Sequence, residues 1–317
     1  MARTNPFKRH VFTFVCLVFI LLYAVLFSVA ISKTSGNSRT FEQTQVQASL
    51  LPPSWWFYNE QQKNQVSELG DSWFSIFGTD QLGRDVFSRC VVGGAVSIAV
   101  GLFAACIAVF LGTAWGTVAA VKGGRVDSTM MRIVDILYGL PSIMLVVLIT
   151  IAANALLLSK NVDSTIYSEF IQVVCMICAI GTVSWLTVSR VIRGQVKSLL
   201  ARPTMEACKV MGLHPKRMFT HHLLPALLGT ILVYATLTVP AAILSEAFLS
   251  FLGIGIREPI PSWGNLASDG LSQLNPVHSR WWLLFWPCLC ISFTLVVMNW
   301  LGQLLRRHAT RIASEPV

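Results

Sequence analysis

The residues of this 317-residue chain that could perform chemistry are few, and their spacing fits no standard catalytic or metal site. A Walker A loop needs a Gly-Lys dipeptide, which does not occur in the chain. The pairs Cys175-x-x-Cys178 and Cys288-x-Cys290 lack the second pair of ligands that a zinc site requires. Neither a His-Glu-x-x-His nor a Gly-x-Ser-x-Gly motif is present. We therefore predict no catalytic residue, cofactor or metal ligand, and apolar packing for both cysteine pairs.

A basic segment, residues 190–225, has a pattern that indicates two short helices. Pro203 suits a first helical turn, the residues after it favour a helix, and Gly212 suits the left-handed position that ends one. Pro215 then suits the start of a second helix. This segment is the part of the chain best suited to contact a partner.

The first of these helices is predicted to be amphipathic. Met205, Cys208 and Met211 recur every three residues and so form an apolar stripe, whereas Glu206 and Lys209 point elsewhere. Judged from these residues alone, the helix either lies on anionic lipid or docks to a cytoplasmic partner.

The elements that must position this segment are apolar. The chain is 54% hydrophobic and 12% charged, whereas an ordinary soluble domain carries about 25% charged residues, and this difference excludes a soluble enzyme and a disordered chain. A membrane-spanning helix needs about 20 apolar residues. We therefore predict an all-α integral membrane fold with six transmembrane helices, the first of them retained rather than cleaved as a signal peptide. The predicted spans are 11–31, 95–121, 136–158, 170–189, 226–245 and 281–305.

The basic residues predict the orientation of these spans. Sixteen of the 24 Lys and Arg residues lie in the segments that would share one side of the membrane with the N-terminus. Cytoplasmic loops carry the excess of basic residues, so both termini are predicted to be cytoplasmic. The formal net charge of +9 then reflects topology, and we predict no nucleic-acid partner. The predicted parts are a cytoplasmic N-terminus with the first span (1–31), an extracytoplasmic segment (32–90), a transmembrane core (91–305) and a cytoplasmic tail (306–317).

Small residues recur at every fourth position of the second span. They form one helical face without bulk, which allows a neighbouring helix to approach closely. These residues are Ala104, Ala108, Gly112, Gly116 and Ala120.

Prolines and two carboxylates mark the places where the spans could bend or carry charge. Pro141, Pro240 and Pro287 fall within predicted spans, as ordinary kinks or as points of gating in a mobile, water-lined helix. Glu246 and Asp135 are predicted at span ends as interfacial, paired or snorkelled carboxylates. The pattern shows no relay of carboxylates or histidines at mid-depth, which disfavours a proton-coupled carrier.

The 190–225 segment resembles the EAA loop of the permease subunits of bacterial ABC importers, through Glu206-Ala207-Cys208, Gly212 and Leu224-Pro225. Cys208 departs from the usual second alanine, and His222 stands where an apolar residue is common. Three more motifs within residues 75–305 narrow the resemblance to the dipeptide/oligopeptide permease family. They are Gly78–Val86 with Ser88-Arg89, Arg132–Leu137 with Pro141-Ser142, and Leu244–Gly253 with Pro261–Gly264.

This resemblance implies a type I ABC importer permease that moves di- or oligopeptides. The EAA loop of the family is a coupling helix that sits in a groove of an ATPase subunit. In this chain, Glu206 would then offer a charge to the partner, Ala207 would allow close approach, and Gly212 would permit the tight turn. The resemblance also implies a second permease subunit, two ATPase subunits that bind the ATP, an extracytoplasmic solute-binding protein, a peptide substrate and membrane lipid. The residues that it assigns to coupling are Met205, Glu206, Ala207, Cys208, Gly212, Leu224 and Pro225.

Three other functions remain open from the sequence. The same motifs occur in importers of nickel and other small solutes. An ATP-independent secondary carrier or channel, or a membrane scaffold that binds a partner through the same loop, would also contain six spans.

The extracytoplasmic segment offers two weaker signals. The aromatic stretch Pro52–Tyr58 is typical of anchoring at the membrane interface, with contact to a binding protein as the alternative. The motif at residues 80–89 is predicted to lead into a helix before the second span, with Thr79 or Asp80 as its cap.

Overall fold

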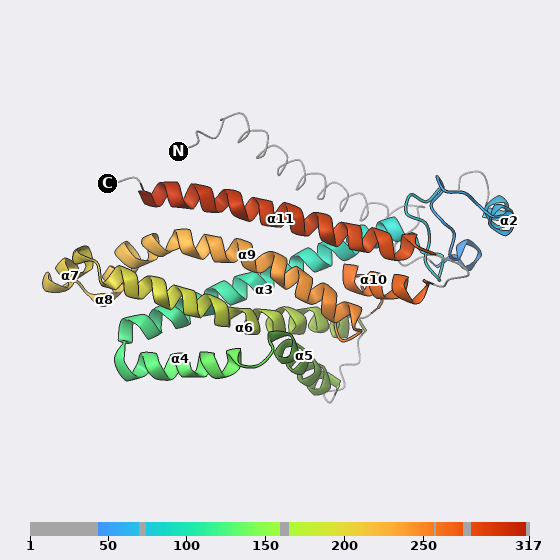
Figure 1. Ribbon diagram of the computed structural model, residues 1–317. Coiled ribbons are helices and arrows are strands. Elements are labelled where there is room, and N and C mark those ends of the chain that lie inside the picture. The colour runs from blue at the N-terminus through green and yellow to red at the C-terminus, as the bar shows by residue number, and fades with distance from the viewer. Residues whose placement is uncertain (1–43, 70–73, 159–164, 257, 275–279, 315–317) are drawn as a thin grey trace. The chain divides into compact units, whose positions relative to one another are not determined.

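The structure, a computed structural model, describes residues 44–69, 74–158, 165–256, 258–274 and 280–314 (Figure 1). The predicted span 11–31 lies outside these residues. The regular elements of the described residues are helices. They are η1 (Val46–Ala48), α2 (Glu60–Leu69), α3 (Val86–Lys122), α4 (Gly124–Tyr138), α5 (Ser142–Leu158), α6 (Thr165–Leu200), α7 (Pro203–Val210), α8 (Pro215–Met218), the π-helical turn η2 (Phe219–Leu223), α9 (Leu224–Phe251), α10 (Trp263–Ser272) and α11 (Trp282–Ser314).

The chain divides into two compact units, each described here by itself. Unit 1 comprises the described residues up to Ile98 together with Ala247–Val297. Unit 2 comprises Ala99–Glu246 and the described residues from Met298 onward. The long helices α3, α9 and α11 contribute to both units.

Four helices of the described residues are long and apolar enough to cross a membrane, and each coincides with or contains one of the predicted spans to within one residue at either end. They are Val86–Lys122, Phe170–Leu200, Phe219–Phe251 and Trp282–Leu304. A fifth candidate is the bent pair formed by α4 and α5. The prediction of an all-α integral membrane fold is therefore confirmed for the described residues.

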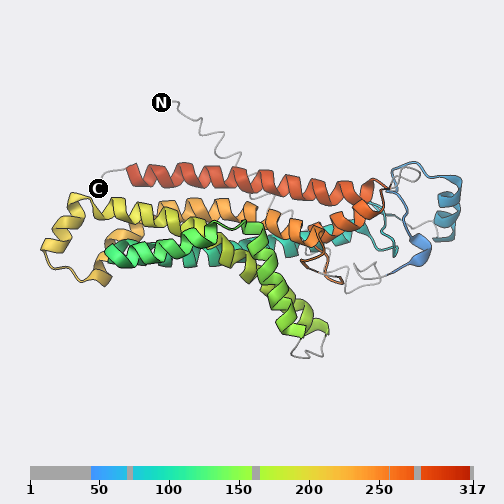
Figure 2. The same ribbon diagram turned by 60° about the horizontal axis from the view of Figure 1, so that its bottom comes forward.

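The prediction of one continuous helix over residues 136–158 is wrong. Helix α4 ends at Tyr138 and α5 begins at Ser142, and the two helices are bent by 88° relative to each other (Figure 2). Pro141 lies in the break, where it has no N–H for a helical hydrogen bond and disfavours helical backbone at Leu140. Pro141 thus ends a helix instead of kinking one, whereas Pro240 and Pro287 lie inside α9 and α11.

In unit 2, α3 and α6 approach each other so closely that glycine is required at the contact. A Cβ atom on Gly112 would lie 2.6 Å from Cβ of Val188, and one on Gly116 would lie 2.4 Å from the carbonyl oxygen of Ser189. The other members of the small-residue face are also buried. These are Ala104, Ala108 and Ala120.

We expect Gly116→Ala to lower the free energy of unfolding by about 1–3 kcal/mol, because the added methyl group overpacks a contact made by backbone. Gly194→Ala is the matched control, since a Cβ on Gly194 of α6 meets nothing within 4 Å. The control should be neutral or more stable, by up to about 1 kcal/mol, because alanine favours a helix. Thermal unfolding of the detergent-solubilised protein measures both. Equal midpoints for the two variants would contradict the close α3–α6 contact.

In unit 1, α10 is locked against the first turns of α3. Ser262 caps α10 through a reciprocal pair of hydrogen bonds with Asn265. The buried indole of Trp263 donates from Nε1 to the carbonyl oxygen of Cys90 at 2.9 Å. Helix α10 therefore has a fixed position on α3.

The cap of α3 differs from the prediction. Helix α3 begins at Val86, and Oδ2 of Asp85 accepts from the backbone N–H of Ser88 at 3.0 Å and from its hydroxyl at 2.8 Å. The cap is therefore Asp85 and not Thr79 or Asp80, because helix and span form one continuous element.

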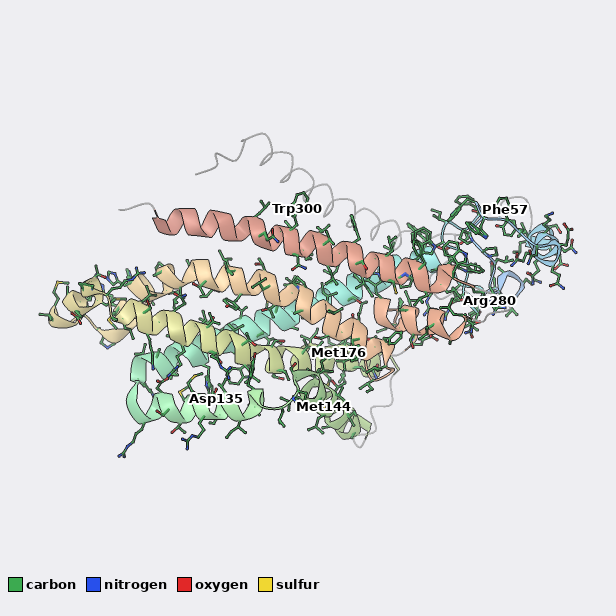
Figure 3. The ribbon with its side chains drawn as sticks, viewed as in Figure 1. Phe57, Asp135, Met144, Met176, Arg280 and Trp300 are labelled. Atoms are coloured by element: carbon green, nitrogen blue, oxygen red, sulfur yellow. The ribbon has the colours of Figure 1, made fainter. Side chains whose placement is uncertain are left out.

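An aromatic cluster covers the start of α11 in unit 1. The ring centroids of Trp56 and Trp281 lie 5.1 Å apart, and Phe77 stacks on Trp286 at 3.9 Å. Phe57 remains exposed (Figure 3). The cluster gathers rings from the aromatic stretch and from α11, as an interfacial belt would require.

Candidate functional site

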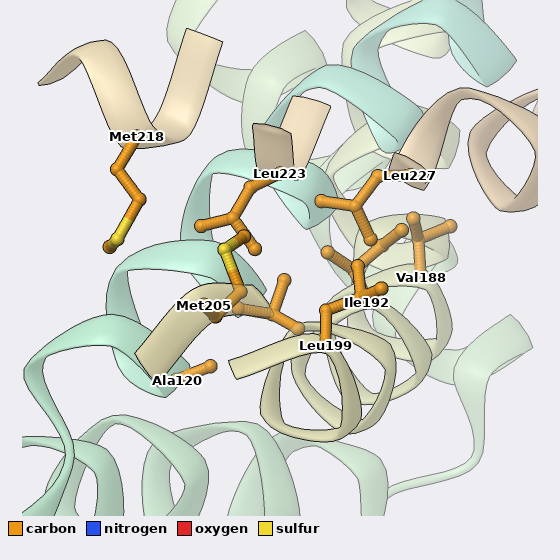
Figure 4. Packing of buried hydrophobic residues seen from close by; sticks show 9 residues of the cluster. Ala120, Val188, Ile192, Leu199, Met205, Met218, Leu223 and Leu227 are labelled. Carbon is orange, nitrogen blue, oxygen red and sulfur yellow. The ribbon is translucent and has the colours of Figure 1, made fainter. Parts of the chain in front are cut away.

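The segment between α6 and α9 folds as a short helical pair that is fixed by its apolar side chains. Met205 and Cys208 of α7 are buried, and so are Met218 at the end of α8 and Leu223 at the end of η2. Met205, Met218 and Leu223 pack in one cluster with residues of α6, α9 and the end of α3 (Figure 4). The other members of this cluster are Ala120, Val188, Ile192, Val196, Leu199 and Leu227.

The opposite face of α7 points to solvent. Glu206 and Ala207 are exposed, and the tip of the helix presents Val210 and Met211 with 89% and 68% of their surface exposed. The prediction that Met211 shares one apolar stripe with Met205 and Cys208 is wrong, because α7 ends at Val210 and Met211 lies beyond the helix. The tip is therefore an exposed apolar surface on an anchored helix.

A glycine makes the turn between α7 and α8. Gly212 has a φ of +67°, in the left-handed region that β-branched residues avoid. The N–H of Met211 donates to the carbonyl of Ala207 at 2.9 Å, and that of Leu213 to the carbonyl of Cys208 at 3.1 Å. These bonds satisfy carbonyl groups that a helix end would otherwise leave open.

The end of the segment adapts to a proline. Leu224 is half-buried and Pro225 is exposed, and both lie in the first turn of α9. Pro225 cannot donate to the carbonyl of His221, and its ring would crowd that carbonyl in a regular helix. The wider π turn Phe219–Leu223 immediately before α9 relieves this conflict. His222, the departure from the importer motif, is exposed on that turn.

Beside this segment, an ionic bracket joins α4 to α6. Asp127, whose residue surface is 5% exposed, pairs with the guanidinium of Arg193, with 2.6 Å between Oδ2 and Nη2. Lys197 donates to the same carboxylate at 2.5 Å. Asp127 was not predicted as a site residue, although it is an isolated acid in a basic connection that precedes a span.

The two carboxylates singled out in the sequence have different surroundings. Asp135, labelled on α4 in Figure 3, pairs with Arg190 of α6 at 2.8 Å. The guanidinium of Arg190 lies 4.2 Å from the ring centroid of Tyr138. Glu246 is fully buried within the protein, in the last turns of α9, which continues to Phe251. Its predicted position at the membrane interface stays a prediction.

We expect Asp127→Asn to lower the free energy of unfolding by about 2 kcal/mol, because two cations lose a buried partner while remaining partly exposed themselves. Asp135→Asn is the matched control and should cost at most about 1 kcal/mol, since that pair is exposed to water. Thermal or denaturant unfolding in detergent measures the difference. An equal or larger decrease in the free energy of unfolding for Asp135→Asn would contradict a specific stabilising role of the ionic bracket.

No group of three or more His, Cys, Asp or Glu residues in the described part of the chain is placed to hold a metal ion. In that part, the pairs Cys175/Cys178 and Cys288/Cys290 are free thiols. Within the described residues, the loop between α6 and α9 presents an anchored helix with an exposed apolar tip.

Residues 108–311 match the family described as binding-protein-dependent transport system inner membrane component. The chain belongs to this family. It is 38% identical over 286 residues to the dipeptide transport system permease protein DppC of Bacillus subtilis, covering 90% of this chain and 78% of that protein. It is 40% identical over 230 residues to the oligopeptide transport system permease protein OppC of Escherichia coli, covering 73% and 70%.

A solved structure of the MetNI methionine ABC transporter in an inward-facing conformation shares the fold. The TM-score is 0.54 at 17% identity, and the match covers 71% of this chain and 97% of that one. This chain is therefore an inner-membrane permease component with several membrane-spanning helices and the fold of a type I ABC importer permease. It is a transport subunit and not an enzyme.

Proposed function

We propose that this chain is one of two membrane subunits of an ABC importer for di- and oligopeptides. The names of its relatives support peptides over nickel or another small solute, since the similarity to DppC and OppC proteins extends over most of the chain. In this proposal a related second permease completes the pathway, two ATPase subunits bind the ATP, and an extracytoplasmic solute-binding protein delivers the peptide.

One observation supports the coupling role most directly: α7 has one buried face and one exposed face. Met205 and Cys208, the apolar stripe that could have rested on lipid, are already buried within the protein. What remains outside is a small apolar tip with Glu206 and Ala207 beside it. Exposed apolar patches mark interaction sites. A partner protein is favoured over lipid here because the stripe that would have rested on lipid is buried.

The distribution of basic residues supports a cytoplasmic position for this loop and for both termini. ATP-driven closure of the ATPase subunits would then move α7, and α6 and α9 would carry that movement into the membrane. The energy of the contact at α7 must differ between the outward-facing and inward-facing states, since only a differential interaction shifts an equilibrium.

Gly212→Val should lower ATP-driven peptide uptake by about tenfold, because a β-branched residue resists the left-handed turn and displaces the tip of α7. Gly212→Asn is the matched control. A Cβ at this position meets nothing within 4 Å, so both side chains find room, and asparagine tolerates the left-handed conformation. Uptake of a labelled dipeptide into reconstituted vesicles measures both variants. Normal uptake by Gly212→Val, with the ATPase subunits bound, would contradict the coupling role.

Glu206→Lys should reduce the amount of ATPase that co-purifies with the permease, because it reverses the charge beside the docking tip. The control is Glu68→Lys, an equally exposed carboxylate on α2. Co-purification is quantified on gels after affinity capture of the permease. Equal recovery of the ATPase with both variants would favour a loop that contacts lipid only.

A further inference from the structure

A cavity of about 190 Å³ opens in unit 1 between the loop before α3 and helix α10. Its polar wall combines side chains from this loop, from the first turn of α3, from the segment before α10, and from α10 with the residue that follows it. These side chains are Asp80, Arg84, Arg89, Glu258, Asp269 and Gln273. No step of the coupling proposal uses this cavity.

Two arginines and two carboxylates of the cavity form a closed ionic network. The guanidinium of Arg89, which is 1% exposed, donates to Asp80 at 2.5 Å and to Glu258 at 2.8 Å. Arg84 donates to the same two carboxylates at 2.7 and 2.8 Å. Although loss of hydration opposes ionisation of Glu258, the hydrogen bonds from Arg89 and Arg84 lower its pKa overall. Two positive and two negative charges thus balance each other.

Asp269 of α10 adds a third carboxylate that this network does not neutralise. Asp269 is exposed, and the ion pairs of Arg84 and Arg89 go to Asp80 and Glu258 and not to Asp269. Loss of hydration raises the pKa of Asp269, and the nearby charge of Glu258 raises it further. The charges of Arg89 and Arg84 oppose these effects. Counted over the described residues, the wall thus contains three carboxylates and two guanidinium groups, and its exposed carboxylate is accessible to a cation of a partner.

We propose that the cavity receives a lysine or arginine side chain of the extracytoplasmic solute-binding protein, with Asp269 as its charge partner. This inference rests on the proposed function, which supplies a binding protein, and on the predicted extracytoplasmic position of the loop before α3. It assigns to that partner a specific point of contact on this subunit.

The surroundings of the cavity favour a protein side chain over a free ion. Leu82 lines the cavity and is exposed, and Leu271 and Leu274 are exposed beside its lining residues in α10. Exposed leucines around a charged depression are suited to an interface in which apolar contacts exclude water from an ion pair. A metal ion is disfavoured, because two guanidinium groups lie in the same wall and no described set of three carboxylate, cysteine or histidine ligands is placed to hold one.

The proposal is tested with the complete importer in lipid nanodiscs and the solute-binding protein that stimulates its ATP hydrolysis. Asp269→Asn should weaken the affinity of that binding protein by about tenfold at low salt, because the partner cation loses its counter-charge. Leu82→Lys, which places an ammonium group at the mouth of the cavity, should weaken it as well. Glu68→Gln on α2 is the control and should bind as wild type. Size-exclusion chromatography shows whether each variant assembles.

The outcomes separate this inference from the proposed function. If no solute-binding protein stimulates the wild-type importer, both fail. If one does, and it binds Asp269→Asn and Leu82→Lys with wild-type affinity, only the inference is overturned. A rise in the KM for peptide uptake with unchanged affinity for the binding protein would also overturn it, since the cavity would then bind the amino group of the peptide. High salt should reduce the difference between wild type and Asp269→Asn, because the lost interaction is electrostatic.

Discussion

The close contact between α3 and α6 is the constraint on which unit 2 depends. Gly112 and Gly116 bring the backbone of α3 against Val188 and Ser189 of α6, where a single added methyl group would collide. In an apolar surrounding, helices gain little from apolar burial against each other, so association relies on such close packing and on polar links. Once α6 is fixed on α3, its C-terminal half becomes the support for the elements that follow.

Two kinds of interaction use that support. The apolar cluster around Ile192 and Leu199 holds Met205 of α7, and the ionic bracket from Asp127 holds the start of α4 on Arg193 and Lys197. A displacement of α7 would therefore move α6 through the apolar cluster. The ionic bracket would transmit the movement of α6 to α4. The exposed tip of α7 is in this way connected to the membrane-spanning part by packed side chains and not by a flexible linker.

The sequence predicted the elements whose signals are local. Long uninterrupted apolar runs predicted the spans that α3, α6, α9 and α11 form. The left-handed turn at Gly212 between two short helices was predicted as well. The sequence did not predict what depends on distant partners. The right angle at Pro141, the burial of Glu246 and the pairing of Asp127 with α6 follow from packing, because hydropathy along one helix does not specify its neighbour. The coupling residues were predicted from resemblance, and their role remains a prediction.

The central claim is that the tip of α7 contacts an ATPase subunit. The most direct measurement places a photo-crosslinking residue at position 210, which is 89% exposed, in the assembled importer, with position 126 on the exposed side of α4 as the control. The account predicts that position 210 crosslinks to the ATPase subunit, with a yield that changes when ATP is added, and that position 126 gives a much lower yield. Crosslinking from position 210 to lipid alone, or equal yields from the two positions, would contradict it.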